Sequence, residues 1–146
     1  KGHPMSAKSV FIPKGVTDKA LATPPIHGKH PIASFKEHLA ALGVLPGTIE
    51  ILENHEVARF ANAAEVHERA ADLWIGLGGE VTFVVGGELV ERVPHPTKED
   101  EWKGTAITGG TEYVVRGGDI LWIPPGEPHT HFGSGWLYII KIPAIV

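Results

Sequence analysis

The stretch Gly118–His131, GDILWIPPGEPHTH, contains a short strand, an abrupt stop and two histidines. The apolar residues that follow Asp119 predict the strand. Two prolines and a glycine then force a turn that regular strand pairing could not make. The chain re-enters a sheet after this turn. Because strand side chains alternate between two faces, His129 and His131 share one face, and we expect both imidazoles to point inward.

The rest of the chain predicts many more short strands. Its 146 residues suit a single domain, and its 18 glycines and 12 prolines punctuate short apolar runs. This pattern is typical of an all-β domain with tight turns. From Thr48 onward the sequence predicts strands only, and the Gly-Gly pairs at 78–79 and 86–87 indicate hairpin turns. We expect a sandwich or a small barrel, whose interior could hold a small ligand among inward polar residues.

The N-terminal part of the chain follows a different pattern. Residues 1–47 are predicted to form an extension that is mostly loop, with a short strand at Ser9–Ile12. The segment SFKEHLAALG, residues 34–43, predicts one helix because it opens with a capping box and ends in glycine. We expect residues 48–146 to form the barrel domain.

Composition excludes several classes of protein. A net charge of −4 gives no sign of a nucleic-acid or anionic-membrane partner. The absence of cysteine excludes disulfides and thiolate metal sites. No apolar run approaches the roughly 20 residues of a membrane span, and no nucleophile elbow, P-loop or dinucleotide fingerprint occurs. We expect a cytoplasmic protein with no nucleic-acid or membrane partner; secretion after cleavage of a signal peptide is the open alternative.

The opening stretch resembles the second motif of the cupin superfamily, G-x-x-x-x-x-P-x-G-x-x-H. Every fixed position of the motif is filled at the expected spacing. The matching residues are Gly118, Pro124, Gly126 and His129.

An upstream stretch, EVHERAADLWIGLGG, resembles the first cupin motif, which is typically H-x-H, then E after three or four residues, then G after six. His67 stands in the place of the second histidine, Asp72 in the place of the glutamate and Gly79 in the place of the glycine. This spacing is similar to that of the germin-like cupins. The departure is Glu65, which occupies the place of the first histidine.

The resemblance covers roughly Thr48 to Ile142 and implies a double-stranded β-helix, the jelly-roll barrel of the cupins. Similar small cupins commonly dimerise, so it also implies a homodimer. Cupins include metal-dependent dioxygenases, isomerases and lyases as well as binding proteins without catalysis.

The candidate residues offer a coherent set of metal ligands. His67 and His129 supply imidazoles, and Glu65 and Asp72 supply carboxylates. Two histidines with one or two carboxylates suit Fe(II), Mn(II), Ni(II) or Zn(II) and leave positions open for substrate or water. Glu65 in place of a histidine makes the set harder, which favours Mn or Fe over Cu. His131 is a candidate for a further ligand or for a hydrogen-bond donor beside the ligands.

Each candidate also has a structural interpretation. His129 would then be a turn histidine that bonds backbone, and His67 a partly exposed residue of a charged strand. The acidic loop from Lys98 to Glu101 indicates a solvated turn, and Arg59 a surface residue. The side chains of Trp74 and Trp122 are predicted to belong to the core. The remaining histidines are predicted to lie on the surface: His27, His30, His38, His55 and His95.

We therefore expect a metal-dependent enzyme of the dioxygenase, isomerase or lyase type that acts on a small polar or aromatic molecule. In this hypothesis Glu65 or Asp72 ligates the metal or moves protons. The alternative is a non-catalytic module whose barrel holds a carbohydrate-like small molecule. The fold by itself does not decide between them.

Overall fold

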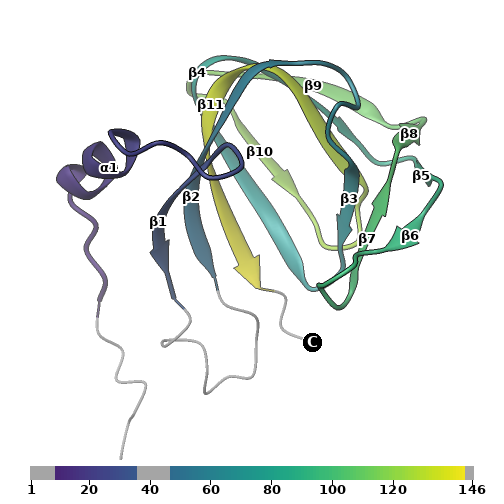
Figure 1. Cartoon of the computed structure of the whole chain (residues 1–146), viewed down its shortest axis with the longest axis horizontal. Coiled ribbons are helices and arrows are strands. Elements are labelled where there is room, and N and C mark those ends of the chain that lie inside the picture. Colours follow the sequence, from purple (N-terminus) through teal and green to yellow (C-terminus); the bar gives the residue numbers. More distant parts are fainter. Residues whose placement is uncertain (1–8, 36–46, 144–146) are drawn as a thin grey trace, which may run out of the picture.

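The structure, a computed structural model, describes residues 9–35 and 47–143 and is built almost entirely of antiparallel strands (Figure 1). Within these ranges one short helix precedes the strands. In chain order the elements are α1 (Lys14–Leu21), β1 (Lys29–Ser34), β2 (Thr48–Val57), β3 (Ala64–His67), β4 (Ala70–Val85), β5 (Glu88–Val90), β6 (Val93–Pro94), β7 (Glu101–Gly104), β8 (Ala106–Thr108), β9 (Thr111–Arg116), β10 (Ile120–Ile123) and β11 (His129–Pro143). In this part of the chain no helix is long and apolar enough to cross a membrane.

Two long strands, β4 and β11, form the frame of the molecule (teal and yellow in Figure 1). They pair antiparallel over nearly their whole length, from His129 opposite Val85 to Pro143 opposite Ala70. The first half of β4 also pairs with β10 and its second half with β9, while β11 pairs with β2 and, at one end, with β3. The bent pair therefore belongs to both walls of the barrel. The prediction of an all-β jelly-roll barrel is confirmed.

The bend in this pair occurs at glycines that the sequence indicated as a turn. β4 continues through Gly78-Gly79 as one uninterrupted strand, so the predicted hairpin there is wrong. Gly79 has φ 69°, and a Cβ on it would lie 2.3 Å from the carbonyl oxygen of Ser134 in β11. Gly133 has φ 109°, and its Cβ would lie 2.7 Å from the oxygen of Glu80. These glycines let two paired strands bend together, because only glycine fits the left-handed backbone at so close an approach.

The predicted turn at Gly86-Gly87 is present, but the strand after it pairs with a different strand than expected. The chain does turn there, but β5 pairs with β8 instead of folding back on β4. The partner of β4 over residues 80–85 is β9. A local turn signal identifies the turn, yet it does not identify which strand receives the one that follows.

The N-terminal residues carry more structure than the sequence predicted. No strand forms at Ser9–Ile12, and α1 occupies residues 14–21, where a loop was expected. α1 buries none of its residues, so it lacks the apolar stripe by which sequence patterns reveal helices. β1 pairs with β2 and extends the sheet. Of the predicted helix at 34–43, only Ser34, in β1, and Phe35 are described; the rest lies outside the described residues. The boundary at residue 47 stays a prediction.

The main hydrophobic core lies between the two walls and is formed chiefly by β4 and β11, with one buried residue each from β2, β9 and β10. Trp74 is buried at 3% exposure, as predicted. Trp122 is 55% exposed, so its prediction is wrong: on β10 it is Ile123 that points inward. His30 is also buried, against its prediction, because α1 covers it: its Nδ1 donates to the Ala20 oxygen at 2.9 Å and its Nε2 lies 2.6 Å from Glu53 Oε2.

Candidate metal centre

Three short segments meet at one end of the barrel. His67 ends β3, Asp72 lies near the start of β4, and His129 begins β11. The turn after β10 makes this meeting possible, since the backbone N–H of Gly126 donates to the His67 carbonyl at 2.8 Å. Gly126 has φ 84°, a conformation that favours glycine. The two predicted motifs are thus joined by a hydrogen bond between their backbones.

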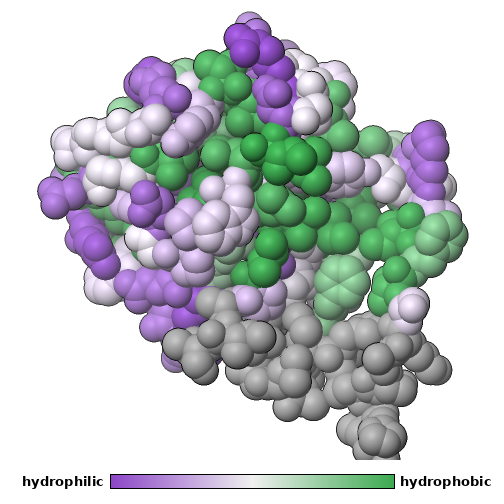
Figure 2. All heavy atoms as spheres, turned by 180° about the vertical axis from the view of Figure 1, so that it is seen from behind, coloured by the Kyte–Doolittle hydropathy of each residue, from purple (hydrophilic) through white to green (hydrophobic). Residues whose placement is uncertain are grey.

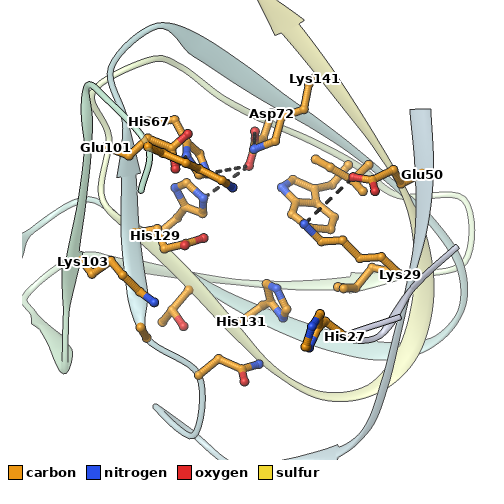
Figure 3. Close-up of a pocket in the computed structure, with 18 of the residues that line it drawn as sticks. His27, Lys29, Glu50, His67, Asp72, Glu101, Lys103, His129, His131 and Lys141 are labelled. Atoms are coloured by element: carbon orange, nitrogen blue, oxygen red, sulfur yellow. Dashed lines mark hydrogen bonds and ion pairs between the residues drawn. The ribbon is translucent and has the colours of Figure 1, made fainter. Parts of the chain in front are cut away.

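The side chains of His67, Asp72 and His129 converge in the interior (Figure 3). Asp72 Oδ2 lies 3.3 Å from His129 Nε2 and 3.7 Å from His67 Nε2. One ligand atom from each residue lies within 4.8 Å of the other two. The residues are 7%, 2% and 6% exposed in chain order. Two imidazole nitrogens and one carboxylate oxygen at these separations can be drawn onto one divalent ion.

The hydrogen bond at the far side of the His129 ring fixes its tautomer. His129 Nδ1 lies 3.1 Å from the backbone oxygen of Glu127, which can only accept, so Nδ1 carries the proton. In the neutral ring, Nε2 then presents a lone pair to Asp72 Oδ2. A cation between these two atoms, either a proton or a metal ion, stabilises such a contact.

His67 has a similar partner on its far side. Its Nδ1 lies 3.1 Å from Glu101 Oε1, with Glu101 contributed by β7. The ring N–H does not point along this line, so neither buried atom forms a hydrogen bond among the described residues. Metal-binding histidines usually donate their second ring N–H to such an acceptor.

Lys141 supplies a positive charge that the sequence analysis did not anticipate. It lies directly opposite Asp72 in the β4–β11 pair, and its Nζ donates to Asp72 Oδ1 at 2.6 Å. Burial alone would raise the pKa of Asp72, but the adjacent His129 ring and the charge of Lys141 outweigh burial and hold this pKa below its usual range. Asp72 is therefore a buried carboxylate anion with Oδ1 bound to Lys141 and Oδ2 facing the imidazoles.

The same surroundings keep His67 neutral. Burial, assisted by the positive charge of Lys141 and by His129, lowers the pKa of His67 to about 3. A neutral imidazole is the form that binds metal ions. The site is thus prepared for a metal at physiological pH without first releasing a proton from His67.

Glu65 and His131 line the same cavity but lie outside this group of three. Glu65 is half-buried and lies near His95 and Glu101. His95 Nδ1 accepts hydrogen bonds from the backbone N–H groups of Thr97 and Lys98, both at 3.1 Å, so its proton is on Nε2. With one ring nitrogen accepting hydrogen bonds and the other protonated, His95 has no lone pair free for a metal ion.

His131 lies one inward step beyond His129 on β11 and points into the cavity (Figure 3). Its Nδ1 accepts from Asn54 Nδ2 at 2.9 Å, and its ring packs against those of Trp74 and Phe83. Burial, with the charges of His129 and Lys29, lowers its pKa to about 4. The predicted alternation therefore places both histidines in one cavity, at different depths.

Two residues of the site were missed for different reasons. Lys141 is the isolated lysine in the apolar run YIIKI, residues 138–142. This pattern could have indicated a buried ion pair, because a charge at an inward strand position needs a partner of opposite charge. Glu101 gave no such signal. It was assigned to a solvated turn, whereas it begins β7 and faces His67. Arg59, in contrast, pairs with Glu112 at 3.0 Å, as expected of a surface residue.

Comparison with known proteins agrees with this architecture. A family model described as the AraC-like ligand binding domain, a cupin-type domain, matches residues 103–138, from β7 into β11. The matched part is a minority of the chain and includes His129 and His131. No curated protein matches the chain in sequence.

Several solved structures are similar to the chain, all at low identity and with TM-scores below 0.5. A protein from Bacillus halodurans is 15% identical with a TM-score of 0.45, over 66% of this chain and 62% of that one. An oxalate oxidase is 18% identical with a TM-score of 0.47, over 84% and 53%. A predicted oxalate decarboxylase from Thermotoga maritima is 13% identical with a TM-score of 0.46, over 81% and 79%. The chain thus spans less than two thirds of the first two proteins.

Proposed function

We propose that this protein is a metal-dependent enzyme that acts on a small polar or aromatic molecule inside the barrel. The observation that carries the proposal is the convergence of His67, Asp72 and His129 at a cavity of about 630 Å³. Three protein ligands are the number that catalytic metal sites commonly use, because they leave coordination positions for water and substrate. The cavity is large enough for a small molecule to reach those positions.

We assign a role to each candidate residue of the site. His67, His129 and Asp72 would hold a divalent ion of Fe, Mn, Zn or Ni, which would supply Lewis-acid or oxygen-binding chemistry. Glu65 and His131 are proposed as further ligands or proton-transfer groups, since both line the cavity. Glu65 lies opposite His129 in the β3–β11 pairing, so its carboxylate belongs to the neighbourhood of the ion.

Elemental analysis of the purified protein tests this function. After removal of bound metal and reconstitution with each of the four ions, we expect about one ion per chain. His129→Ala and His67→Ala should abolish stoichiometric binding, while His55→Ala, at a side chain 92% exposed, should leave it unchanged. Glu65→Gln separates two roles: loss of metal identifies a ligand, and retained metal with lost turnover identifies a proton-transfer group. Unchanged metal content in His129→Ala would refute the proposal.

A second candidate function, a non-catalytic binding module, is favoured by the ion pair between Lys141 and Asp72. This pair already neutralises the carboxylate without a metal ion, at 2.6 Å. The barrel would then hold an uncharged, carbohydrate-like molecule through its polar lining. A protein that takes up none of the four ions but binds a sugar would support this function instead.

We also propose a homodimer, and exposed apolar side chains on the outer face of the sheet support this proposal. Hydrophobic side chains gather over the middle of the face seen in Figure 2. On the outer side of β10 and β11, four apolar side chains are 40–67% exposed: Ile120, Trp122, Trp136 and Ile142. In a two-fold symmetric dimer the same surface patch lies on both sides of the interface, so the patch must be complementary to itself. An uncharged apolar patch meets this condition. Sedimentation should show a dimer that Trp122→Glu converts to a folded monomer; a monomeric wild type would refute it.

A further inference from the structure

The cavity wall beyond the three candidate ligands offers hydrogen-bond donors that lack acceptors. Trp74 Nε1 and Thr130 Oγ1 are buried and have no hydrogen-bond partner within residues 9–35 and 47–143. Both residues line the cavity and are only 3% exposed. An indole N–H can only donate, so Trp74 requires an acceptor that the described protein does not supply. Buried polar groups left in this way point to a missing partner, either water or a ligand.

His131 adds a third donor to this wall. Because its Nδ1 accepts from the Asn54 amide, Nε2 carries the ring proton and can only donate. The rings of His131 and Trp74 meet edge to face, with centroids 5.4 Å apart. Two rings that each carry an N–H donor are thus in contact at the cavity wall.

Positive charge accompanies these donors. Lys29 lines the cavity, and its nearest carboxylate oxygen, on Glu50, is 4.0 Å away, too far for a tight pair. Lys103 also lines the cavity, but it lies on β7 directly opposite Glu65 of β3, on the far side of the cavity from Lys29 (Figure 3). The carboxylates Glu65 and Glu101 belong to β3 and β7, on the side of the cavity near His95.

The spacing between donors and candidate ligands is set by strand geometry. Asp72 and Trp74 are consecutive inward residues of β4, and His129 and His131 are consecutive inward residues of β11. A rise of about 3.3 Å per residue puts successive inward side chains about 7 Å apart along each strand. A ligand that bound the metal through one oxygen could therefore place a second oxygen-bearing group, a few bonds away, against the N–H donors of Trp74 and His131.

We propose that the ligand of this cavity is a small carboxylate anion, held with one end at the His67–Asp72–His129 group and a carboxylate against Trp74, His131 and Lys29. The proposal rests on the proposed metal-dependent function for the first end only. A carboxylate suits the second end because it only accepts hydrogen bonds and carries the charge opposite to lysine. A neutral sugar or amide would bring its own hydrogen-bond donors to a wall that already has more donors than acceptors.

Titration with succinate tests the proposal, with succinamide as its uncharged counterpart. The readout is the indole N–H resonance of Trp74 in ¹⁵N-labelled Zn²⁺-loaded protein, assigned through Trp74→Phe. We expect succinate to move this resonance to saturation, succinamide to leave it in place, and the resonance of exposed Trp122 to stay fixed. Trp74→Phe keeps an apolar ring but removes the donor, so the dissociation constant for succinate, measured by calorimetry, should rise about 10- to 100-fold. Trp122→Phe is the matched control and should bind as the wild type does.

The outcomes separate this proposal from the proposed function. Stoichiometric Zn²⁺ binding without any response to succinate would overturn the carboxylate assignment and leave the metal site intact. Equal binding of succinate and succinamide, or unchanged binding in Trp74→Phe, would also overturn it. A response to succinate in protein that binds no Zn²⁺ would refute the metal function and support the carboxylate wall. If Trp74→Phe does not fold, Thr130→Val removes a different donor and should weaken succinate binding in the same direction.

Discussion

Replacement of Lys141 with methionine is expected to have opposite effects on stability and on metal affinity. The ammonium group lies 2.6 Å from Asp72 Oδ1, and the Lys141 side chain is 22% exposed. Removing one partner of a buried ion pair costs about 3–5 kcal/mol. Because this lysine is partly solvated and His129 still faces the other oxygen of Asp72, we expect about 2–3 kcal/mol of lost stability in metal-free protein.

The same substitution removes a charge that repels a metal ion. An ion bound to Asp72 Oδ2 would lie roughly 6 Å from the ammonium, where a divalent ion and a unit charge repel by about 1.4 kcal/mol in a water-like dielectric and about 5.5 kcal/mol at an effective dielectric of 20. The lower figure corresponds to about tenfold in affinity. We therefore expect Lys141→Met to bind Zn²⁺ at least about tenfold more tightly than the wild type, and Zn²⁺ to restore its stability.

Urea denaturation with EDTA or Zn²⁺, together with competition against a chromogenic chelator, measures both effects. Lys19→Met, on the exposed surface of α1, is the control and should change neither quantity. Weaker Zn²⁺ binding by a folded Lys141→Met protein would show that Lys141 supports the ion, and the electrostatic reasoning above would be wrong.

Three further predictions follow from the geometry. Glu101→Gln should weaken Zn²⁺ binding about 10- to 100-fold in calorimetry, because it removes the charged acceptor that faces the ring N–H of His67, a candidate ligand. Exposed Glu99→Gln is its control, and equal Zn²⁺ affinity of the two variants would exclude this positioning role. The lowered pKa of His131, about 4 against about 6.5 unfolded, makes the unfolded chain bind an additional proton below pH 6.5. The contribution of His131 to metal-free stability should therefore be full above pH 7 and fall towards pH 4 by up to about 3 kcal/mol, and His67, whose pKa is lowered to about 3, adds a loss in the same direction; a flat profile in urea titrations would contradict it. Gly79→Ala should cost about 2–4 kcal/mol, more than Gly118→Ala, which shares a positive φ but has open space around its Cβ; equal losses would mean that the backbone, and not the close approach, explains the cost.

The turn that builds the site could be predicted because its signals are local. Two prolines and a glycine stop β10, and the two-residue period of a strand places His129 and His131 on one face. Motif spacing likewise selected His67 and Asp72, which the structure brings to the same point. Each of these inferences uses residues within one short segment.

The parts that could not be predicted depend on pairing between distant segments. Lys141 reaches Asp72 because β11 pairs with β4, and Glu101 reaches His67 because β7 pairs with β3. Gly79 shows the same limit in another form: a glycine pair that bends two paired strands is locally indistinguishable from one that ends a strand. His30 was assigned to the surface because nothing in its neighbourhood indicated that α1 would cover it.

The continuous β4–β11 pair also has a kinetic consequence. The candidate ligands His67 and Asp72 precede β9 and β10 in the chain, while His129 follows them, so these side chains meet only after β11 has paired with β4 across the intervening strands. Contacts of this kind form late, because a long loop must close before they can contribute. An ion at this point would therefore act on the native state and leave the transition state for folding almost untouched. It would lengthen the lifetime of the folded protein by slowing unfolding, while the rate of folding would stay that of the metal-free chain.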